Sequence, residues 1–538
     1  MPRLPDLDSM KPDDVKALAV DLLEENGRLR DEITRLKGLS PRPPFKPSRM
    51  EDGTDSERTP SDKRSARGSK RPRNGGRKGS LRTADLTIHE EKVLKPGALP
   101  EDCRFKGRKR FVVQDLRLEA HVTRYHRECY RAPDGTLVTA PLPAGIVGHF
   151  GANLVRFVLQ QYYECNVTEP KLLAQLHAFG IKISLAALSN LLIEGKAAFH
   201  AEKQEILAAG LSCATALTVD DTGARHQGRN GHTTHIGNQY FAFFETTESK
   251  SRLNFLRTLL LGGVFGYRVT DATVAYWQDH GLPQALIDPL LEAPAKAFAD
   301  DQNWQGHLTA LGITGAHHQQ CATEGALWGA IVEQRLLEGV VVVSDGAPQF
   351  AIGDHARCWI HAERQVQQIA CATPEQHRLV ERTRDRIWKL YRALKQYAKA
   401  GRIDAAASRR LRARFDRIFN AGNTGFAALD AILDALFAIK SKLLRVLDRP
   451  DVPLHTNNSE GDIRIRVEKR KISGGTRGDE GRRCLDTFVS ITKTLRKHAL
   501  TFWDYLGSRL GMDGPTHRSD YLQRRSTPTR INRPLPLN

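Results

Sequence analysis

The chain has 538 residues, of which 40% are hydrophobic, and its 81 Lys and Arg against 62 Asp and Glu give a net charge of +19. This length exceeds one ordinary core, so we expect a globular protein of three or four structural units. The positive surplus favours a polyanionic partner, most commonly nucleic acid. No run approaches about 18 apolar residues, which argues against a membrane span.

Eight cysteines are scattered without a framework spacing, and the N-terminus is polar. We therefore expect no signal peptide and free thiols in a reducing cytoplasm. Residues 1–40 are predicted to form a leucine-zipper-like helix, because Val15, Leu22, Leu29 and Leu36 fall seven apart with Asn26 at a partner position. The pattern favours a parallel dimer, although a helix packed on its own chain remains open.

Residues 41–84 are predicted to be a flexible basic linker, since positions 41–80 hold twelve Lys and Arg against five Asp and Glu among many Pro, Gly and Ser. Residues 85–140 alternate like strands and predict a small β-rich module similar to a degenerate zinc finger. Cys103, His126 and Cys129 make only three zinc ligands without a close cysteine pair, so we expect no zinc there.

Residues 141–211 predict a helical region with a helix–Gly turn–helix stretch, KLLAQLHAFGIKISLAALSNLL, that could dock on DNA or simply pack. Residues 212–372 predict the first part of an α/β core. CATALTVDD and HTTHIGNQYFAFFETT indicate strands, and SRLNFLRTLLL a third. GVVVVSDG indicates a buried central strand, and HARCWIHAERQVQQI a strand leading into a helix.

Residues 373–452 repeat apolar positions at three and four and predict an all-helical insertion. Residues 453–515 predict the second part of the core, a helix near Glu460, a glycine loop and another helix, with Asn457, Asn458 or Ser459 as candidate caps. Residues 516–538 are expected to be disordered. Cys358 and His361 could bind metal, but packing between strand and helix is the favoured role.

Three acids occupy positions suited to phosphodiester chemistry. Asp220 and Asp345 end two predicted strands, and Glu460 lies near the start of a helix. Three converging carboxylates can share two Mg²⁺ ions, which neutralise charge at the attacking and leaving oxygens. Turn, capping and helix-dipole roles remain open for each residue taken singly.

Basic residues follow two of these acids in the sequence. Phosphate contact and a solvated surface are both open for them. The candidate DNA-binding residues are Arg225, Arg229, Arg464, Arg466, Lys469, Arg470 and Lys471.

The order of motifs VDDTG, SDG, CWIHAER, PLHTNNSEGDIRIR and GGTRGDEG resembles the transposases of the insertion sequence 66 family. The resemblance implies a ribonuclease H-like mixed-sheet core with a helical insertion. It implies that Asp220, Asp345 and Glu460 are catalytic and hold two Mg²⁺ or Mn²⁺ ions, with Asp221 and Asn457 supporting them. Residue 221 is Asp where the family has Glu, and Asp221 is the rival of Asp220.

By the same resemblance the protein would cut the ends of a mobile element and join them to target DNA in the bacterial nucleoid. Its partners would be DNA, further copies in a homodimer or higher complex, and accessory proteins of the element. Two alternatives remain open: a metal-dependent nuclease without strand transfer, and an inactive DNA-binding protein.

Overall fold

The computed structural model describes residues 86–97, 103–143, 145–420 and 422–512. The predicted zipper helix, basic linker and C-terminal tail therefore lie outside the described residues. The described part divides into two compact units. One comprises Ala356–His455, and the other comprises the described residues on either side of that segment. Among the described helices, none combines the length and the apolar composition that a bilayer crossing requires.

The predicted β-rich module at residues 85–140 contains a single short hairpin in its described residues. Strands β1 (Cys129–Arg131) and β2 (Leu137–Thr139) pair antiparallel and are exposed throughout. The alternating stretch before β1 forms no strand, so that prediction is wrong there. Alternation alone does not stabilise a strand that has neither a paired neighbour nor a core to cover.

The region before the sheet is helical, as predicted. It contains α3 (Ala152–Leu159), a π-helical turn η3 (Gln160–Glu164), α4 (Glu169–Ala178), α5 (Leu185–Ile193) and α6 (Ala197–Cys213). Gly180, with a φ of 84°, lies in the turn between α4 and α5. The hydroxyl of Ser184 then accepts a hydrogen bond from the Ala187 backbone N–H and caps α5.

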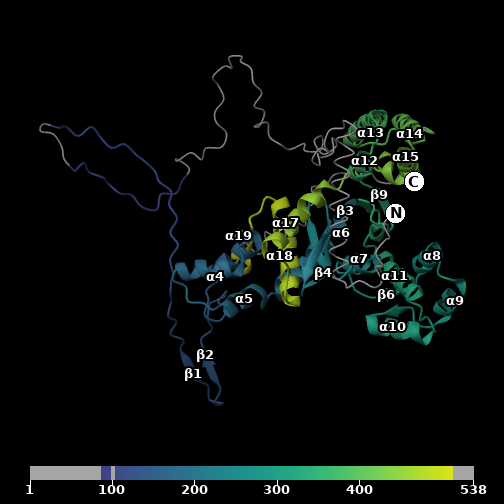
Figure 1. Ribbon diagram of the computed structural model, residues 1–538. Helices are drawn as coiled ribbons and strands as arrows, with labels where there is room; N and C mark the ends of the chain where they lie inside the picture. The colour runs from purple at the N-terminus through teal and green to yellow at the C-terminus, as the bar shows by residue number, and fades with distance from the viewer. Residues whose placement is uncertain (1–85, 98–102, 144, 421, 513–538) are drawn as a thin grey trace, which may run out of the picture. The chain divides into compact units, whose positions relative to one another are not determined.

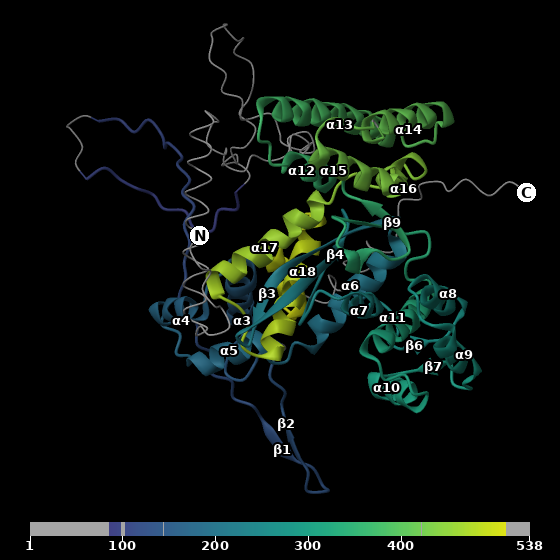
Figure 2. The same cartoon turned by 45° about the vertical axis from the view of Figure 1, so that its right-hand side comes forward.

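A five-stranded mixed sheet forms the centre of the larger unit (Figures 1 and 2). Its order is β5 (Ala242–Thr247), β4 (Arg229–Gly237), β3 (Ala216–His226), β8 (Val341–Ser344) and β9 (Asp354–Arg357). The first three strands in sequence pair antiparallel, and β8 pairs parallel with β3. All four residues of β8 are buried, which confirms the predicted central strand.

The predicted third strand SRLNFLRTLLL is wrong, because these residues form helix α7 (Arg252–Leu260). The buried residues Phe255, Leu256, Leu259 and Leu260 follow helical spacing, and Ser251 caps the helix by accepting from Asn254 N–H. The third strand is β5, which begins at Ala242 within the preceding apolar run. The prediction for SRLNFLRTLLL failed because both runs are rich in apolar residues and only the period of those residues distinguishes helix from strand.

A helical module separates α7 from β8. It comprises α8 (Asp271–Asp279), α9 (Gln284–Glu292), α10 (Asp301–Ala310) and α11 (Ala316–Glu333), with the two-residue strands β6 (Tyr267–Arg268) and β7 (Ala297–Phe298). The turn η4 (Pro348–Phe350) follows β8 and contacts α7. These elements belong to the same apolar core as the sheet.

Three C-terminal helices complete the larger unit: α17 (Asn457–Ser473), α18 (Asp479–Lys497) and α19 (Phe502–Arg509). Helix α17 lies against β3 and β4 (Figure 2). It begins at Asn457, so the capping position is Thr456, and the predicted capping by Asn457, Asn458 or Ser459 is wrong. The Thr456 side chain itself makes no capping hydrogen bond.

Helix α18 covers the edge of the sheet that is formed by β5. The backbone N–H groups of Ala242, Phe244 and Thr246 in β5 donate to side-chain oxygens of Thr494, Ser490 and Asp486 at 3.1, 2.9 and 2.9 Å. The spacing matches, because four helical residues rise about 6 Å and two strand residues about 6.8 Å. The helix therefore satisfies the donors that an edge strand would otherwise expose.

The smaller unit is helical. It contains α12 (Trp359–Gln367), α13 (Pro374–Ala400), α14 (Ala405–Phe419), α15 (Ala427–Ala438), α16 (Lys440–Leu443) and the short turn η5 (Arg445–Leu447) around a core of its own. Cys358 and Trp359 are buried in this core, and the Trp359 indole N–H donates to the Leu443 carbonyl at 2.8 Å. These contacts support the packing role favoured for this motif.

The glycine loop between α17 and α18 packs on the tip of the β3–β4 hairpin. Thr476 N–H donates to the Arg225 carbonyl at 3.0 Å, and Gln227 N–H donates to the Thr476 carbonyl at 2.8 Å. Gly475 has a φ of 152°, and a Cβ there would lie 2.3 Å from the Arg225 carbonyl oxygen. This close approach of two backbones requires glycine.

We expect Gly475→Ala to lower the free energy of unfolding by about 1–3 kcal/mol, because the new methyl group forces the loop away from the hairpin. Urea denaturation would measure the change. Gly481→Ala is the matched control, since Gly481 lies in α18 with open space around it. Equal stability of the Gly475→Ala variant and wild type would contradict the docked loop.

Candidate active site

Asp220 lies inside β3, which continues to His226 and does not end at Asp220 as predicted. Asp345 directly follows β8, the parallel neighbour of β3, as predicted. The pairs Ala216–Val341, Leu217–Val342 and Thr218–Val343 fix the register of the two strands. Asp220 and Asp345 each come two residues after the last of these pairs, Thr218–Val343, so the same register, if extended, would set them side by side. Neighbouring strands lie about 4.8 Å apart, and aligned residues point to the same face. The sheet therefore carries these two predicted carboxylates on, and directly after, neighbouring parallel strands.

The face on which Asp220 lies is the face covered by α17. Thr218, two residues earlier on β3, accepts a hydrogen bond from the Ser459 hydroxyl of α17 at 2.7 Å. His235, paired directly opposite Asp220 on β4, contacts Asp462 of α17 at 3.2 Å. Side chains two apart on one strand, and side chains of directly opposed residues, share a face. Both relations place Asp220 beneath α17.

Glu460 immediately follows Ser459 in the first turn of α17. The residue is half-buried, and one of its carboxylate oxygens is buried. The hydrogen bond from Ser459 to Thr218 thus anchors the first turn of α17 on β3. Thr218 lies two residues before Asp220, and Glu460 belongs to the anchored turn. Asn457, the predicted supporting residue, is the first residue of the same helix and is also half-buried.

Asp221 points to the opposite face of β3, since neighbouring residues of a strand alternate. Its carboxylate oxygens pair with the Lys250 ammonium at 2.5 Å and accept from the Gln349 side-chain amide at 2.7 Å. The side chain is only 6% exposed. These contacts occupy Asp221 away from α17, which favours Asp220 over Asp221 as the first metal ligand.

His235 and Asp462 also belong to this face, and neither was predicted from the sequence. Burial raises the pKa of Asp462, but contact with His235 and with Lys497 at 2.7 Å outweighs burial, and the net pKa is lowered. Burial also lowers the pKa of His235, which keeps the ring neutral. The helical spacing of Ser459 and Asp462 was the available signal, because residues three apart share a helix face.

The ligand atoms of Asp220, Asp345 and Glu460 do not all lie within 4.8 Å of one another, as those of a preformed single-ion site would. Among the described residues, the one group of three or more metal-type side chains whose ligand atoms all lie within 4.8 Å of one another is His200, Glu480 and Cys484. Two ions about 3.5–4 Å apart, however, require ligands spread over both ions. An all-oxygen set, with two members on, and directly after, neighbouring parallel strands, fits hard cations such as Mg²⁺.

Comparisons with known proteins agree with the motif order. Residues 328–483, which include Asp345 and Glu460, match the model of the family described as Transposase IS66 family. A Sinorhizobium fredii (strain NBRC 101917 / NGR234) protein named "Uncharacterized protein y4jO" is 45% identical over 311 residues, 57% of this chain and 96% of the relative. The chain belongs to the IS66 family of transposases. Membership implies an enzyme of the nucleotidyl transferase kind with DNA as its substrate.

Five of the seven basic residues predicted to contact DNA have accessible side chains in this IS66 transposase. Arg225 and Arg229 lie at the exposed tip of the β3–β4 hairpin. Arg464 and Lys471 are exposed on α17, whereas Arg470 is half-buried and donates to the Gly223 carbonyl. The exposed four remain available to phosphate groups, and Arg470 supports the hairpin that carries two of them.

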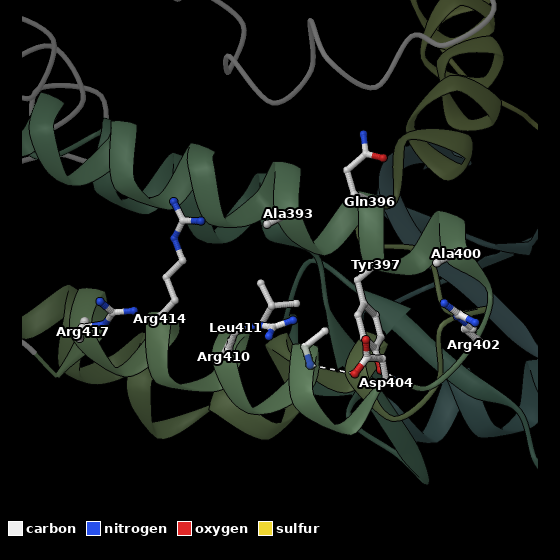
Figure 3. Close-up of a pocket in the computed structure, with 11 residues that line it drawn as sticks. Ala393, Gln396, Tyr397, Ala400, Arg402, Asp404, Arg410, Leu411, Arg414 and Arg417 are labelled. Carbon is white, nitrogen blue, oxygen red and sulfur yellow. Dashed lines mark hydrogen bonds between the residues drawn. The ribbon is translucent and has the colours of Figure 1, made fainter.

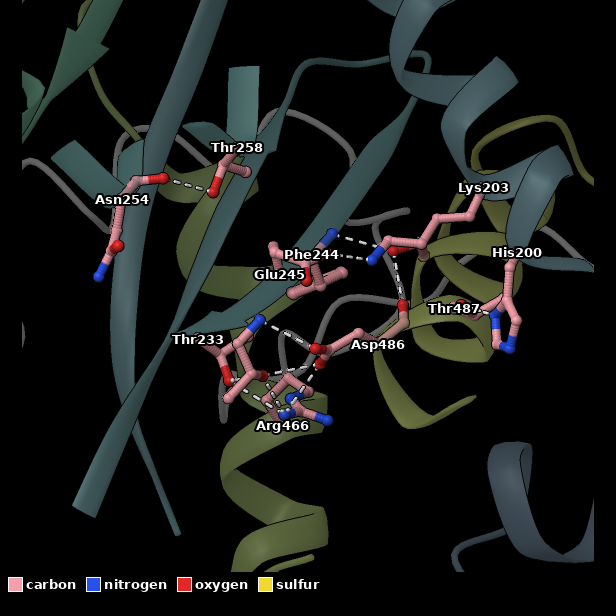
Figure 4. A network of polar contacts seen from close by, with 12 residues as sticks. His200, Lys203, Thr233, Phe244, Glu245, Asn254, Thr258, Arg466, Asp486 and Thr487 are labelled. Carbon is pink, nitrogen blue, oxygen red and sulfur yellow. Dashed lines mark hydrogen bonds and ion pairs between the residues drawn. The ribbon is translucent and has the colours of Figure 1, made fainter. Parts of the chain in front are cut away.

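Arg466 and Lys469 correct the prediction, because both are buried. Arg466 is 7% exposed, pairs with the Asp486 carboxylate at 3.1 Å and donates to the hydroxyls of Thr233 and Thr246 at 3.0 and 2.9 Å (Figure 4). Lys469 donates to the Tyr162 carbonyl at 2.8 Å, and burial lowers the pKa of its ammonium to about 8. Their place on the inner face of α17 makes them structural residues, which local charge density could not reveal.

The group His200, Glu480 and Cys484 joins α6 to α18. The His200 ring contacts the Thr487 hydroxyl through Nδ1 at 2.8 Å, and its Nε2 lies 3.9 Å from both the Cys484 sulfur and a Glu480 oxygen (Figure 4 labels His200 and Thr487). Burial lowers the pKa of His200 to about 4, with Arg483 adding to the effect, and burial raises the pKa of Cys484 to about 11. The ring and the thiol are therefore neutral near pH 7. Cys103 and Cys129 of the proposed zinc-finger-like module are exposed and stand outside this group.

The lowered pKa of His200 predicts a loss of stability in acid. Between pH 6.5 and about 4 the unfolded chain binds a proton that the folded ring does not, so the free energy of unfolding falls as pH falls, by up to about 1.4 kcal/mol per pH unit. Urea denaturation across this range should give a smaller slope for His200→Asn than for wild type. The exposed His149→Asn variant is the control. Identical slopes in all three proteins would contradict the buried neutral ring.

Proposed function

We propose that this IS66 transposase cuts the ends of its mobile element and transfers them to target DNA, using Asp220, Asp345 and Glu460 as ligands of two Mg²⁺ or Mn²⁺ ions. The observation that carries the proposal is the parallel pairing of β3 with β8, whose last pair, Thr218–Val343, precedes Asp220 and Asp345 by two residues each. The Ser459 hydroxyl in the first turn of α17 donates to Thr218 on the same face. The strand order, with three antiparallel strands followed by a parallel fourth strand beside the first, supports a ribonuclease H-like core.

The two bound ions would neutralise charge on the reacting phosphate and stabilise the attacking and leaving oxygens. The chain itself contributes fixed carboxylates and fixed strand positions. Lys250 and Gln349 hold Asp221 on the far face, which keeps the orientation of Asp220 towards α17. Arg225, Arg229, Arg464 and Lys471 are proposed to bind phosphates of the substrate, as long exposed cations do at phosphodiester backbones.

Two displacements at phosphorus follow from the resemblance to other members of the family. In the first, the oxygen of water forms a bond to phosphorus at the element end, and the 3′ oxygen of the element leaves as a hydroxyl. In the second, that hydroxyl attacks a target phosphodiester, and the target's 3′ oxygen leaves. Each step forms one P–O bond and breaks another, so no oxidant or other co-reactant is needed. A homodimer or higher complex would bring both ends together.

The test is an assay on labelled duplexes that carry an element end, with and without a second target duplex. We expect new 3′ ends and joined products in Mg²⁺ or Mn²⁺ and neither product in EDTA. Cleavage without joining under all conditions would favour the nuclease alternative. Tight binding to end DNA without cleavage in either metal would favour an inactive DNA-binding protein.

A further inference from the structure

The helical unit contains a cleft of about 520 Å³ between α13 and α14. Four arginines line it, namely Arg402, Arg410, Arg414 and Arg417. Figure 3 shows Arg414 extending from α14 towards α13, with Arg410 and Arg402 further along the cleft. Ala393, Ala400 and Ala407 also line the cleft, and their small side chains leave room beside the guanidinium groups.

The charge of the four guanidinium groups is only partly offset within the protein, by the nearby carboxylate of Asp404. Across the described residues, none of the four guanidinium groups forms an ion pair, whereas Arg412 of the same helix pairs with Asp448 at 2.7 Å. The acidic residue that lines the cleft is Asp404, and its carboxylate already caps α14 by accepting from Ala406 and Ala407 N–H at 2.9 and 3.0 Å. The cleft therefore presents a strong, unbalanced positive charge to solvent.

The arrangement of the cations matches an extended polyanion. Arg410, Arg414 and Arg417 share one face of α14, because residues four and three apart lie on the same side of a helix. Their positions span about 10 Å along the helix axis. A DNA strand carries one phosphate per about 3.4 Å of axis, so the row covers roughly three phosphates. Residues 374–419 hold fourteen Lys and Arg against five Asp and Glu, a surplus of nine.

We propose that this arginine cleft binds the phosphodiester backbone of duplex DNA, which gives the helical unit its own DNA-binding role apart from the face formed by Asp220 and Asp345. Arginine suits this role, because its planar fork donates two hydrogen bonds to one phosphate. Contacts of this kind position DNA without reading its sequence. The inference rests on the proposed function in one respect, namely that DNA is the substrate.

The experiment measures the affinity of the full chain for a mixed-sequence duplex of about 30 base pairs, in EDTA, as salt rises from about 50 to 200 mM. We expect the doubly substituted variant Arg410→Gln, Arg414→Gln to lower the slope of log K against log salt by about 1.8, since each phosphate that an arginine neutralises contributes about 0.9. At about 0.1 M salt, the same factor gives roughly eightfold weaker binding for each arginine replaced. Unchanged melting temperature would establish that the variant is folded.

The matched control is the variant Arg409→Gln, Arg382→Gln, which removes the same charge from exposed positions on α14 and α13 outside the cleft. It should keep the wild-type slope. The variant Arg410→Lys, Arg414→Lys should keep most of the wild-type slope, because it retains the positive charge. An equal slope change in the Arg409, Arg382 control, or none in the Arg410, Arg414 variant, would overturn the proposal.

Binding in EDTA involves no chemistry, so this result is independent of the proposed catalytic acids. If Asp220→Asn still cleaves DNA while the Arg410, Arg414 variant shows the reduced slope, the catalytic assignment fails and the cleft stands. Inorganic phosphate added at a fixed ionic strength gives a further arm. Phosphate binding to wild type that the Arg410, Arg414 variant loses, together with an unchanged salt slope of that variant for the duplex, would assign the cleft to free phosphate and contradict a DNA-binding role.

Discussion

Asp220→Asn, Asp345→Asn and Glu460→Gln are each expected to reduce the cleavage rate of element ends by about three orders of magnitude or more, with binding of end DNA retained. A metal-held transition state is stabilised by several kcal/mol, and each 1.4 kcal/mol of stabilisation removed corresponds to about a tenfold slower rate. Single-turnover cleavage in Mg²⁺ and Mn²⁺, beside binding in EDTA, would measure both quantities.

Asp221→Asn is the matched control for Asp220, because it changes the adjacent carboxylate on the opposite face of the same strand. We expect its cleavage rate to stay within about tenfold of wild type, with a stability change of about 1 kcal/mol or less, since its partner Lys250 is 47% exposed. An inactive Asp221→Asn beside an active Asp220→Asn would reverse the first assignment. Asp462 provides the same comparison on α17. If Asp462→Asn abolished cleavage and Glu460→Gln did not, the third ligand would be wrong.

Arg466→Met is expected to lower the free energy of unfolding by about 3–5 kcal/mol, because it leaves the Asp486 carboxylate buried without its cation. Asp486 is 1% exposed, so water cannot solvate its charge when the guanidinium is removed. It also accepts hydrogen bonds from the Thr246 N–H and hydroxyl at 2.9 and 2.8 Å. Urea denaturation with a constant m-value would report the destabilisation.

Arg464→Gln is the control for Arg466, because it lies two residues earlier on the same helix and is exposed. Its stability should remain within about 0.5 kcal/mol of wild type. Its affinity for a DNA duplex should fall, with a salt slope smaller by about 1. A stable Arg466→Met variant with weakened DNA binding would restore the original prediction that Arg466 contacts DNA.

The basic stretch of α17 explains why some site residues were predictable and others were not. Arg464, Arg466 and Lys469 have similar local sequence, yet only Arg464 is exposed. The helix turns about 100° per residue, so a dense run of basic residues must direct some of them inwards. Which ones point inwards depends on the partners that the sheet offers, and Asp486 and Tyr162 are both remote in sequence.

The failed third strand has a different origin. In residues 251–261 the apolar residues are spaced at three and four, and the structure is the helix that this spacing favours. The period of the apolar residues in this segment indicates a helix, whereas their number alone does not distinguish a helix from a strand. In residues 103–128 the period was that of a strand, but the described residues pair with no partner strand there. A strand depends on its neighbour, and a short segment cannot specify one.

Local sequence was sufficient for the central strand β8 and the helices of the smaller unit, because burial and helical period act over a few residues. The three candidate acids came from the order of the motifs, and their role as metal ligands stays a prediction. Tertiary structure alone decided that Asp220 rather than Asp221 faces α17, and that β8, which Asp345 follows, is the parallel neighbour of β3. Those facts depend on the register of β3 and β8 and on a hydrogen bond between residues 241 positions apart. Pairing across such separations is fixed by the packing of the whole sheet, which no local pattern encodes.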